Sequence, residues 1–144
     1  MTRLLRGGVR LSDAEHFLLQ GSVERLDPEI RDVVVSQFEQ YNLVQREVDG
    51  RAVNFYKIKL GHGAPLEVSE LLAMTAAEAP LIKISVALPG EERPLHAVLT
   101  AVNGRAFCLT FDRVPPRAPF GPGAEVTSST QSWRSEVRAH TRVA

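Results

Sequence analysis

The sequence contains a single cysteine, Cys108, among its 144 residues. One thiol cannot form an intrachain disulfide, and it cannot supply a four-cysteine zinc site. The chain also lacks any apolar run that approaches the roughly 18 residues of a membrane-spanning helix. Domains of this length bury about two-thirds of their unfolded surface, so they fold without a metal or a disulfide. With 44% hydrophobic and 24% charged residues, the composition predicts one soluble α+β domain.

Motifs of the common enzyme classes are missing as well. The sequence has no Gly-x-Ser-x-Gly elbow, no dinucleotide fingerprint and no phosphate loop with its lysine. No two histidines lie four residues apart, which is the spacing of a helical metal site. The pair Glu91 and Glu92 falls in a predicted loop, where carboxylates normally only face solvent. These absences favour a protein that is not an enzyme without excluding catalysis, and we expect no metal and no cofactor.

The net charge is zero, but the charges are unevenly distributed. Residues 1–10 carry +3 and residues 113–144 carry +3, so residues 11–112 carry −6. An acidic body argues against a nucleic-acid-binding face on the fold itself, although the basic ends could contact phosphate or an acidic partner. Residues 1–10 lack the apolar core of a secretory signal, which together with the lone thiol predicts a cytoplasmic protein. The excess of arginine over lysine, 14 to 3, is typical of a GC-rich bacterial genome.

The last part of the chain is predicted to be a linker and a tail. Residues 115–123 contain four prolines and two glycines, which disfavour helices and central strands. We therefore expect a basic arm at 1–10, a single α+β domain at 11–112, and a Pro/Gly/Ser-rich linker with a mobile basic tail at 113–144. Trp133 leaves one alternative open, a short helix over 132–140 that docks on the body.

Two helices are predicted at the start of the domain. Ser12 and Glu15 have the spacing of a capping box, and this helix should end near residue 20, with Gly21 as a left-handed cap. Asp27 and Pro28 mark the first turn of a second helix. The apolar residues of the second helix recur at spacings of three and four: Ile30, Val33, Val34, Phe38 and Tyr41.

The end of the second helix is open between two alternatives. Asp49-Gly50 has the composition of a two-residue hairpin turn, which would pair residues 43–48 with a strand at 51–60. Otherwise the helix continues to about residue 47. Either way, residues 51–60 are rich in aromatic and β-branched residues and predict a strand.

A third helix is predicted after this strand. Pro65 can open it and Pro80 can stop it, and a strand follows at 81–88. With a final hairpin at 95–112, the expected order is α-α-β-β-α-β-β-β. The fold class is therefore α+β, with an antiparallel sheet of about five strands and helices packed mainly on one face.

Asn103-Gly104 is the strongest hairpin turn in the sequence. A two-residue turn predicts the pairs Val102–Arg105, Thr100–Phe107, Val98–Leu109 and His96–Phe111, which together give a bulky apolar face. The opposite face is also apolar but mostly small, and it comprises Leu95, Ala97, Leu99, Ala101, Ala106 and Cys108. A ribbon that is apolar on both sides must be covered on both sides, by helices or by a second copy of the chain, so we predict the small-residue face as an interface.

A second candidate site is the turn Gly61-His62-Gly63, between a predicted strand and the N-terminus of the predicted third helix. The free amides and the positive dipole end of a helix can hold an anion there, and glycines let a ligand approach the backbone. Tyr56 on the preceding strand could contribute to this site. Cys108, by contrast, is predicted to lie mid-strand as an inert thiol.

These patterns favour a non-catalytic protein-interaction domain, of which a homodimer is one form. The alternative is a small-ligand or anion-binding protein, including an enzyme, with its site at Gly61-His62-Gly63. The sequence alone leaves the partner, the ligand, the strand order and the oligomeric state undetermined.

Overall fold

The computed structural model describes residues 10–66, 71–116, 119–131 and 137–139 of the chain. Two helices, α1 (Asp13–Glu24) and α2 (Pro28–Gln40), come first, and the strands follow. The six main strands are β1 (Leu43–Arg46), β2 (Ala52–Tyr56), β6 (Glu78–Ala87), β7 (Leu95–Val102), β8 (Arg105–Phe111) and β9 (Glu125–Gln131). Four short strands form two separate pairs, β3 (Ile58–Lys59) with β4 (His62–Gly63), and β5 (Leu72–Met74) with β10 (Val137–Ala139).

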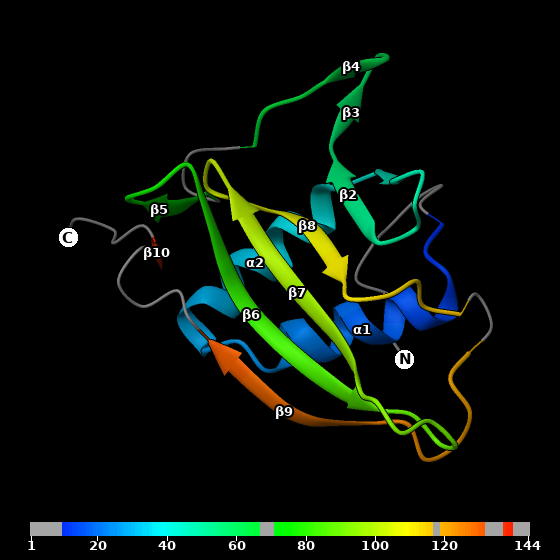
Figure 1. Ribbon diagram of the computed structural model, residues 1–144. Helices are drawn as coiled ribbons and strands as arrows, with labels where there is room; N and C mark the ends of the chain where they lie inside the picture. Colours follow the sequence, from blue (N-terminus) through cyan, green and yellow to red (C-terminus); the bar gives the residue numbers. More distant parts are fainter. Residues whose placement is uncertain (1–9, 67–70, 117–118, 132–136, 140–144) are drawn as a thin grey trace.

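The six main strands form one antiparallel sheet in the order β1-β2-β8-β7-β6-β9. Both helices lie on the same side of this sheet, behind it in Figure 1. We call this side the inner face, because its side chains form the core with the helices, and we call the other side the outer face. The predicted α+β class, with an antiparallel sheet and helices on one face, is confirmed, with six strands where about five were expected. No helix in the described part of the chain has both the length and the apolar character needed to cross a membrane.

Helix α1 begins as predicted and ends later. The capping box is present, since the Glu15 amide donates to Ser12 Oγ at 3.1 Å and the Ser12 amide donates to Glu15 Oε1 at 2.8 Å. The helix does not stop at Gly21 but continues to Glu24. Gly21 lies in the helix interior, where a Cβ atom would be 3.2 Å from Val126 of β9. Its missing side chain therefore serves close packing of a strand against the helix and not a left-handed cap.

Helix α2 begins at Pro28 behind Asp27, as predicted, and ends at Gln40. The first hairpin follows directly, so the shorter of the two alternatives for this helix is correct. Leu43 pairs with Tyr56 and Arg46 with Val53, which is the register set by a two-residue turn at Asp49-Gly50.

The predicted third helix is wrong for the residues that the structure describes between its two prolines. Residues 71–79 contain β5 and the start of β6, and residues 67–70 lie outside the described ranges. Leu72, expected on a helical stripe, pairs with β10 and donates its amide to the Gly104 carbonyl at 2.8 Å. Pro80 lies inside β6 at a shift in the pairing with β7, a position where a strand tolerates proline.

The hairpin of β7 and β8 closes at the predicted turn, but its register changes soon afterwards. Val102 pairs with Arg105 as expected, whereas Thr100 pairs with Cys108. Phe107 is therefore one extra residue in β8, a β-bulge. The predicted pairing of Thr100 with Phe107 is wrong, and so are the two pairs beyond it.

The bulge moves the large apolar residues of β8 into the core. Leu109 now pairs with Leu99 and Phe111 with Ala97, and all four side chains lie on the inner face, where they are buried. Without the extra residue, Leu109 and Phe111 would lie on the outer face, because a slip of one residue exchanges the two faces of a strand. The burial of these two side chains is thus a physical reason for the bulge.

Part of the predicted tail belongs to the sheet. Residues 125–131 form β9, which pairs with β6 along its length and forms one edge of the sheet. Phe120 packs edge-to-face against Phe17 of α1, with 5.3 Å between the ring centroids. The alternative of a short helix over 132–140 is not borne out at 137–139, which form β10; its other residues, with Trp133, lie outside the described ranges.

Candidate functional site

The residues that the sequence assigned to an interface lie on two different faces. Five of them are fully buried on the inner face, beneath the chain's own helices: Leu95, Ala97, Leu99, Ala101 and Ala106. The sixth, Cys108, is half-buried on the outer face, opposite Thr100 and Asn54. The small-residue face is therefore core, and the opposite face of the sheet is the one that the helices leave uncovered.

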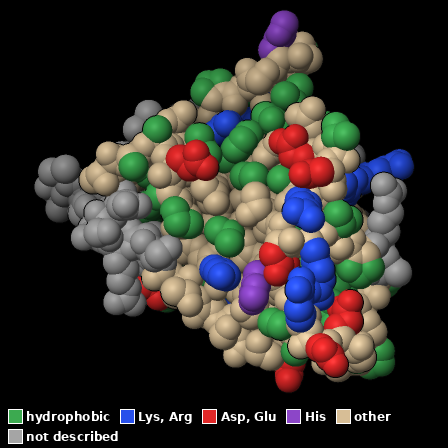
Figure 2. Space-filling view, in the orientation of Figure 1, with side chains coloured by type: hydrophobic (Ala, Val, Ile, Leu, Met, Phe, Trp, Pro, Cys, Tyr) green, Lys and Arg blue, Asp and Glu red, His purple; other side chains and the backbone are tan. Residues whose placement is uncertain are grey.

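The outer face carries its own apolar side chains. Half-buried residues of its central strands include Tyr56, Val98, Val102, Phe107 and Cys108, which we call the outer patch. The rings of Tyr56 and Phe107 meet edge-to-face with 5.2 Å between centroids, and the Arg105 guanidinium lies 5.4 Å from the Phe107 ring centroid. Figure 2 views this side of the molecule and shows hydrophobic side chains interspersed with charged ones of both signs. Neither α1 nor α2 covers this surface.

The thiol of Cys108 is held in its neutral form on this face. Burial raises its pKa to about 11, and the negative charges of Glu47 and Glu78 act in the same direction. A thiolate is the nucleophilic form of cysteine, so at neutral pH this side chain behaves as a small hydrophobic group. This agrees with the inert thiol expected from the sequence.

The segment Gly61-His62-Gly63 is exposed: Gly61 lies in the turn that joins β3 to β4, and His62 and Gly63 form β4. His62 pairs with Lys59 across this small ribbon, and a Cβ atom at either glycine would meet no other atom within 4 Å. The residues described after it, 64–66, are not helical, so the helix that was expected to begin at Pro65 is absent from this part of the described chain. Tyr56 contributes its ring to the outer patch instead.

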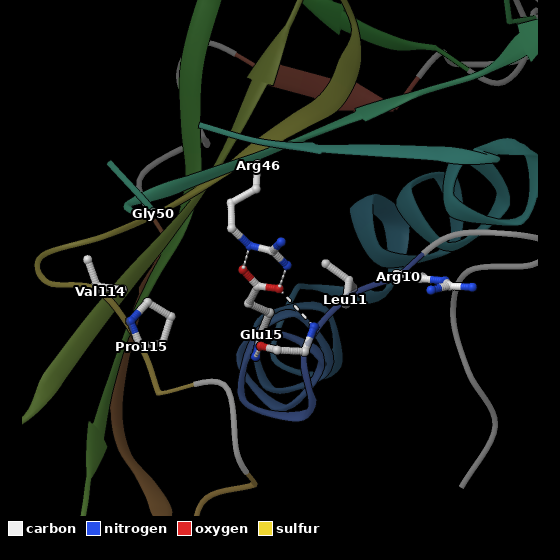
Figure 3. A pocket seen from close by; sticks show the side chains of 8 residues that line it. Arg10, Leu11, Glu15, Arg46, Gly50, Val114 and Pro115 are labelled. Carbon is white, nitrogen blue, oxygen red and sulfur yellow. Dashed lines mark hydrogen bonds and ion pairs between the residues drawn. The ribbon is translucent and has the colours of Figure 1, made fainter. Parts of the chain in front are cut away.

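A pocket that the sequence did not suggest lies at the N-terminus of α1. Its floor is an ion pair between Glu15, on the first turn of α1, and Arg46, at the end of β1 (Figure 3). Arg46 donates from Nε to Glu15 Oε2 at 2.6 Å and from Nη2 to Glu15 Oε1. The Glu15 side chain is 3% exposed, and the Arg46 side chain is 33% exposed. The rest of the lining combines apolar surface from Leu11, Gly50, Val114 and Pro115 with the polar residues Arg10 and Ser12.

The ion pair keeps both of its members charged. Burial raises the pKa of Glu15, but the hydrogen bonds from Arg46 and Ser12 and the positive charge of Arg46 outweigh it, so the net pKa lies below the ordinary 4.5. The hydrogen bond to Glu15 raises the pKa of Arg46 in turn. Charged hydrogen bonds of this bidentate kind fix the guanidinium plane as well as attract it.

Of the two members of this ion pair, the sequence analysis singled out Glu15 and missed Arg46. Glu15 was identified as a capping residue, and its second role depends on a residue 31 positions away. One local signal existed. Val44 and Arg46 are two residues apart in β1 and therefore lie on the same, inner face of the strand, so an arginine occupies a core-facing position. A charge at such a position indicates a buried partner.

Comparison with protein-family models, with curated proteins and with solved structures finds no match for this chain. In the described part of the chain, no group of three or more histidine, cysteine or carboxylate side chains is placed to hold a metal ion.

Proposed function

We propose that this chain is a non-catalytic protein-interaction domain that associates with a second copy of itself through the outer face of its sheet. The observation that carries the proposal is the outer patch, an apolar group at the centre of a sheet face that the two helices leave open. Contiguous apolar groups on a sheet face typically mark a contact with another protein.

The charges on the outer face favour a second copy as the partner. Arg105 and Lys83 supply positive charge there, and Glu47 and Glu78 supply negative charge near Cys108. A two-fold symmetric interface places the same patch of two chains together, so it must be self-complementary. A face that carries charges of both signs around an apolar centre is compatible with that condition.

The states of the Cys108 thiol and the Glu15 carboxylate support a binding role over catalysis. The thiol of Cys108 is neutral at neutral pH, and the Glu15 carboxylate is fully engaged with Arg46 and Ser12. The anion-binding alternative at Gly61-His62-Gly63 has less support, because it depended on a helix that begins at Pro65, and the described residues 64–66 are not helical. We further propose a cytoplasmic, bacterial setting, which is supported by the single free thiol and the arginine-rich composition.

Sedimentation equilibrium over a wide range of protein concentration tests the proposal. The wild-type chain should form a dimer, and Val98→Lys should be monomeric, because it places an unpaired charge in the middle of the interface. Val48→Lys is the matched control, since Val48 is 106% exposed at the tip of the first hairpin and should leave the dimer intact.

Phe107→Ser gives a second, uncharged way to weaken the interface, and circular dichroism checks that each variant keeps the wild-type fold. A wild-type chain that is monomeric at every concentration would overturn the proposal. So would a folded Val98→Lys or Phe107→Ser variant that dimerises as well as wild type.

A further inference from the structure

We propose that the pocket between the N-terminus of α1 and the first hairpin binds a small carboxylate that has an apolar body. The pocket has a volume of about 360 Å³. Small-molecule sites range from roughly 300 to 1,000 Å³, so this one suits a ligand of modest size. It lies at the inner side of β1, away from the outer patch, and is independent of the dimer proposed above.

The polar recognition group is the unused edge of Arg46. Its Nε and Nη2 atoms are bound to Glu15, and no residue in the described ranges accepts a hydrogen bond from its Nη1 atom. The side chain is 33% exposed, so solvent and ligands can reach it. A carboxylate can accept a charge-assisted hydrogen bond from this nitrogen.

Glu15 makes Arg46 a preorganised donor. The carboxylate is buried, and the Ser12 amide holds it at 2.8 Å in the first turn of α1. A guanidinium that is hydrogen-bonded along one edge has lost most of its rotational freedom before a ligand binds. This lowers the entropic cost of binding. Figure 3 shows this pair, with Leu11 on one side and Val114 and Pro115 on the other.

The walls of the pocket select for an apolar body behind the charge. Val114 is a hydrophobic side chain that remains 57% exposed, so a ligand can still cover it. Leu11 and Pro115 extend the same surface. A hydrated inorganic anion would leave these walls wet, whereas an aliphatic carboxylate would bury them and gain from the hydrophobic effect. Two sources offer this chemistry, a free aliphatic acid and the C-terminus of a peptide that ends in an apolar residue.

Titration with sodium hexanoate, followed by ¹H–¹⁵N correlation spectra of the wild-type chain, tests the site. Hexanoate should shift the amides of residues 11–15, 46–50 and 114–115 in a saturable manner. Hexanol and hexylamine have the same chain without the anion and should bind roughly tenfold more weakly or worse, which is the expected loss for one hydrogen bond to a charged group.

Two variants separate the walls from the donor. Val114→Phe fills the pocket and should abolish the hexanoate shifts, while Val48→Phe, the same change at an exposed position outside it, should not. Arg46→Lys keeps a positive charge for Glu15 but lacks the second donor edge, so hexanoate should bind roughly tenfold more weakly.

A peptide arm then distinguishes the two sources. Acetyl-glycyl-leucine with a free carboxylate should bind more tightly than hexanoate if the natural ligand is a chain terminus, and less tightly if it is a free acid; its C-terminal amide should not bind in either case. The proposal is overturned if hexanoate leaves these amides unshifted, if hexanol binds equally well, or if Val114→Phe binds like wild type.

Discussion

Glu15 is a buried carboxylate that connects two elements of the fold. One carboxylate completes the capping box of α1 and holds Arg46 at the end of β1. Removal of one member of a buried ion pair destabilises the fold by more than the intact pair stabilises it. The remaining charge is then buried without solvent and without a partner. Glu15 therefore ties the first helix to the first hairpin, and both of them to the pocket.

The lowered pKa of Glu15 makes stability depend on acid. Because the pKa in the folded state lies below the ordinary 4.5 of an unfolded chain, the ion pair stabilises the fold fully above pH 4.5 and loses this effect as the pH falls through the folded-state pKa. Urea unfolding at a series of pH values should show this loss in the wild type, and Glu15→Gln should lack that part of the acid slope. Asp13→Asn, at an exposed position two residues earlier, should keep it; an unchanged slope in Glu15→Gln would contradict the assignment.

Among the glycines in the described part of the chain, Gly104 has the least room for a side chain. Its φ is +88°, and a Cβ atom there would lie 2.8 Å from the Leu72 carbonyl oxygen. We expect Gly104→Ala to lower the free energy of unfolding by about 3 kcal/mol, from backbone strain and overpacking together. Gly90 is the matched control, since its φ is +79° but a Cβ atom there would meet nothing within 4 Å. Gly90→Ala should lose only about 1 kcal/mol by urea denaturation, and equal losses at both positions would be inconsistent with a clash at Leu72.

At the scale of elements, the bulge in β8 depends on helix α2. Strand β2 pairs with β8 only as far as Cys108, so Ala106 has no strand neighbour on that side. Two side chains of the α2 segment take its place: Gln37 accepts from the Ala106 amide at 2.8 Å, and the Tyr41 hydroxyl donates to the Ala106 carbonyl at 2.6 Å. The helix thus satisfies backbone groups that the sheet leaves open, as buried backbone groups require.

Substitution of Gln37 tests this dependence. Gln37→Met keeps a similar volume but leaves the buried Ala106 amide without its acceptor, so we expect a loss of about 2 kcal/mol and faster hydrogen exchange at that amide. Tyr41→Phe removes one neutral hydrogen bond and should lose about 1 kcal/mol. Gln45→Met on the exposed side of β1 should change stability by less than about 0.5 kcal/mol. Slow exchange at Ala106 in Gln37→Met would argue against the role of the helix.

Over the whole molecule, the two helices near the start of the chain contact the strand β9 near its end. The Asp27 amide donates to Gln131 Oε1 at 2.9 Å across 104 residues, and Val126 of β9 packs against Gly21 of α1. Strand β9 forms the edge of the sheet that packs against the second half of α1, where Gly21 faces Val126. The contacts that close the fold are therefore formed between its first helices and its last long strand.

Val126 provides the test of that closure. Its side chain packs against the core from β9, so Val126→Ala should lower the free energy of unfolding by about 1–2 kcal/mol. Val48→Ala is the same change at a fully exposed position and should alter stability by less than about 0.5 kcal/mol. If residues 113–144 were a mobile tail, Val126→Ala would change the free energy of unfolding, measured by urea denaturation, as little as Val48→Ala does.

The sequence by itself determined what depends on neighbouring residues. The capping box at Ser12, the start of α2 at Asp27-Pro28 and the turns at Asp49-Gly50 and Asn103-Gly104 are all present, because each is fixed by side chains and backbone angles within a few positions. The α+β class followed from these signals.

Only the tertiary structure decided the features that depend on distant groups. The bulge at Phe107 exists where α2 supplies hydrogen bonds from residues 37 and 41, and the ion pair of the pocket joins residues 15 and 46. Residues 125–131 become a strand because β6 offers an unpaired edge, and a serine- and threonine-rich segment carries no local signal for such a partner. Burial of apolar area and satisfaction of backbone groups are properties of the whole fold, so no short stretch of sequence contains them.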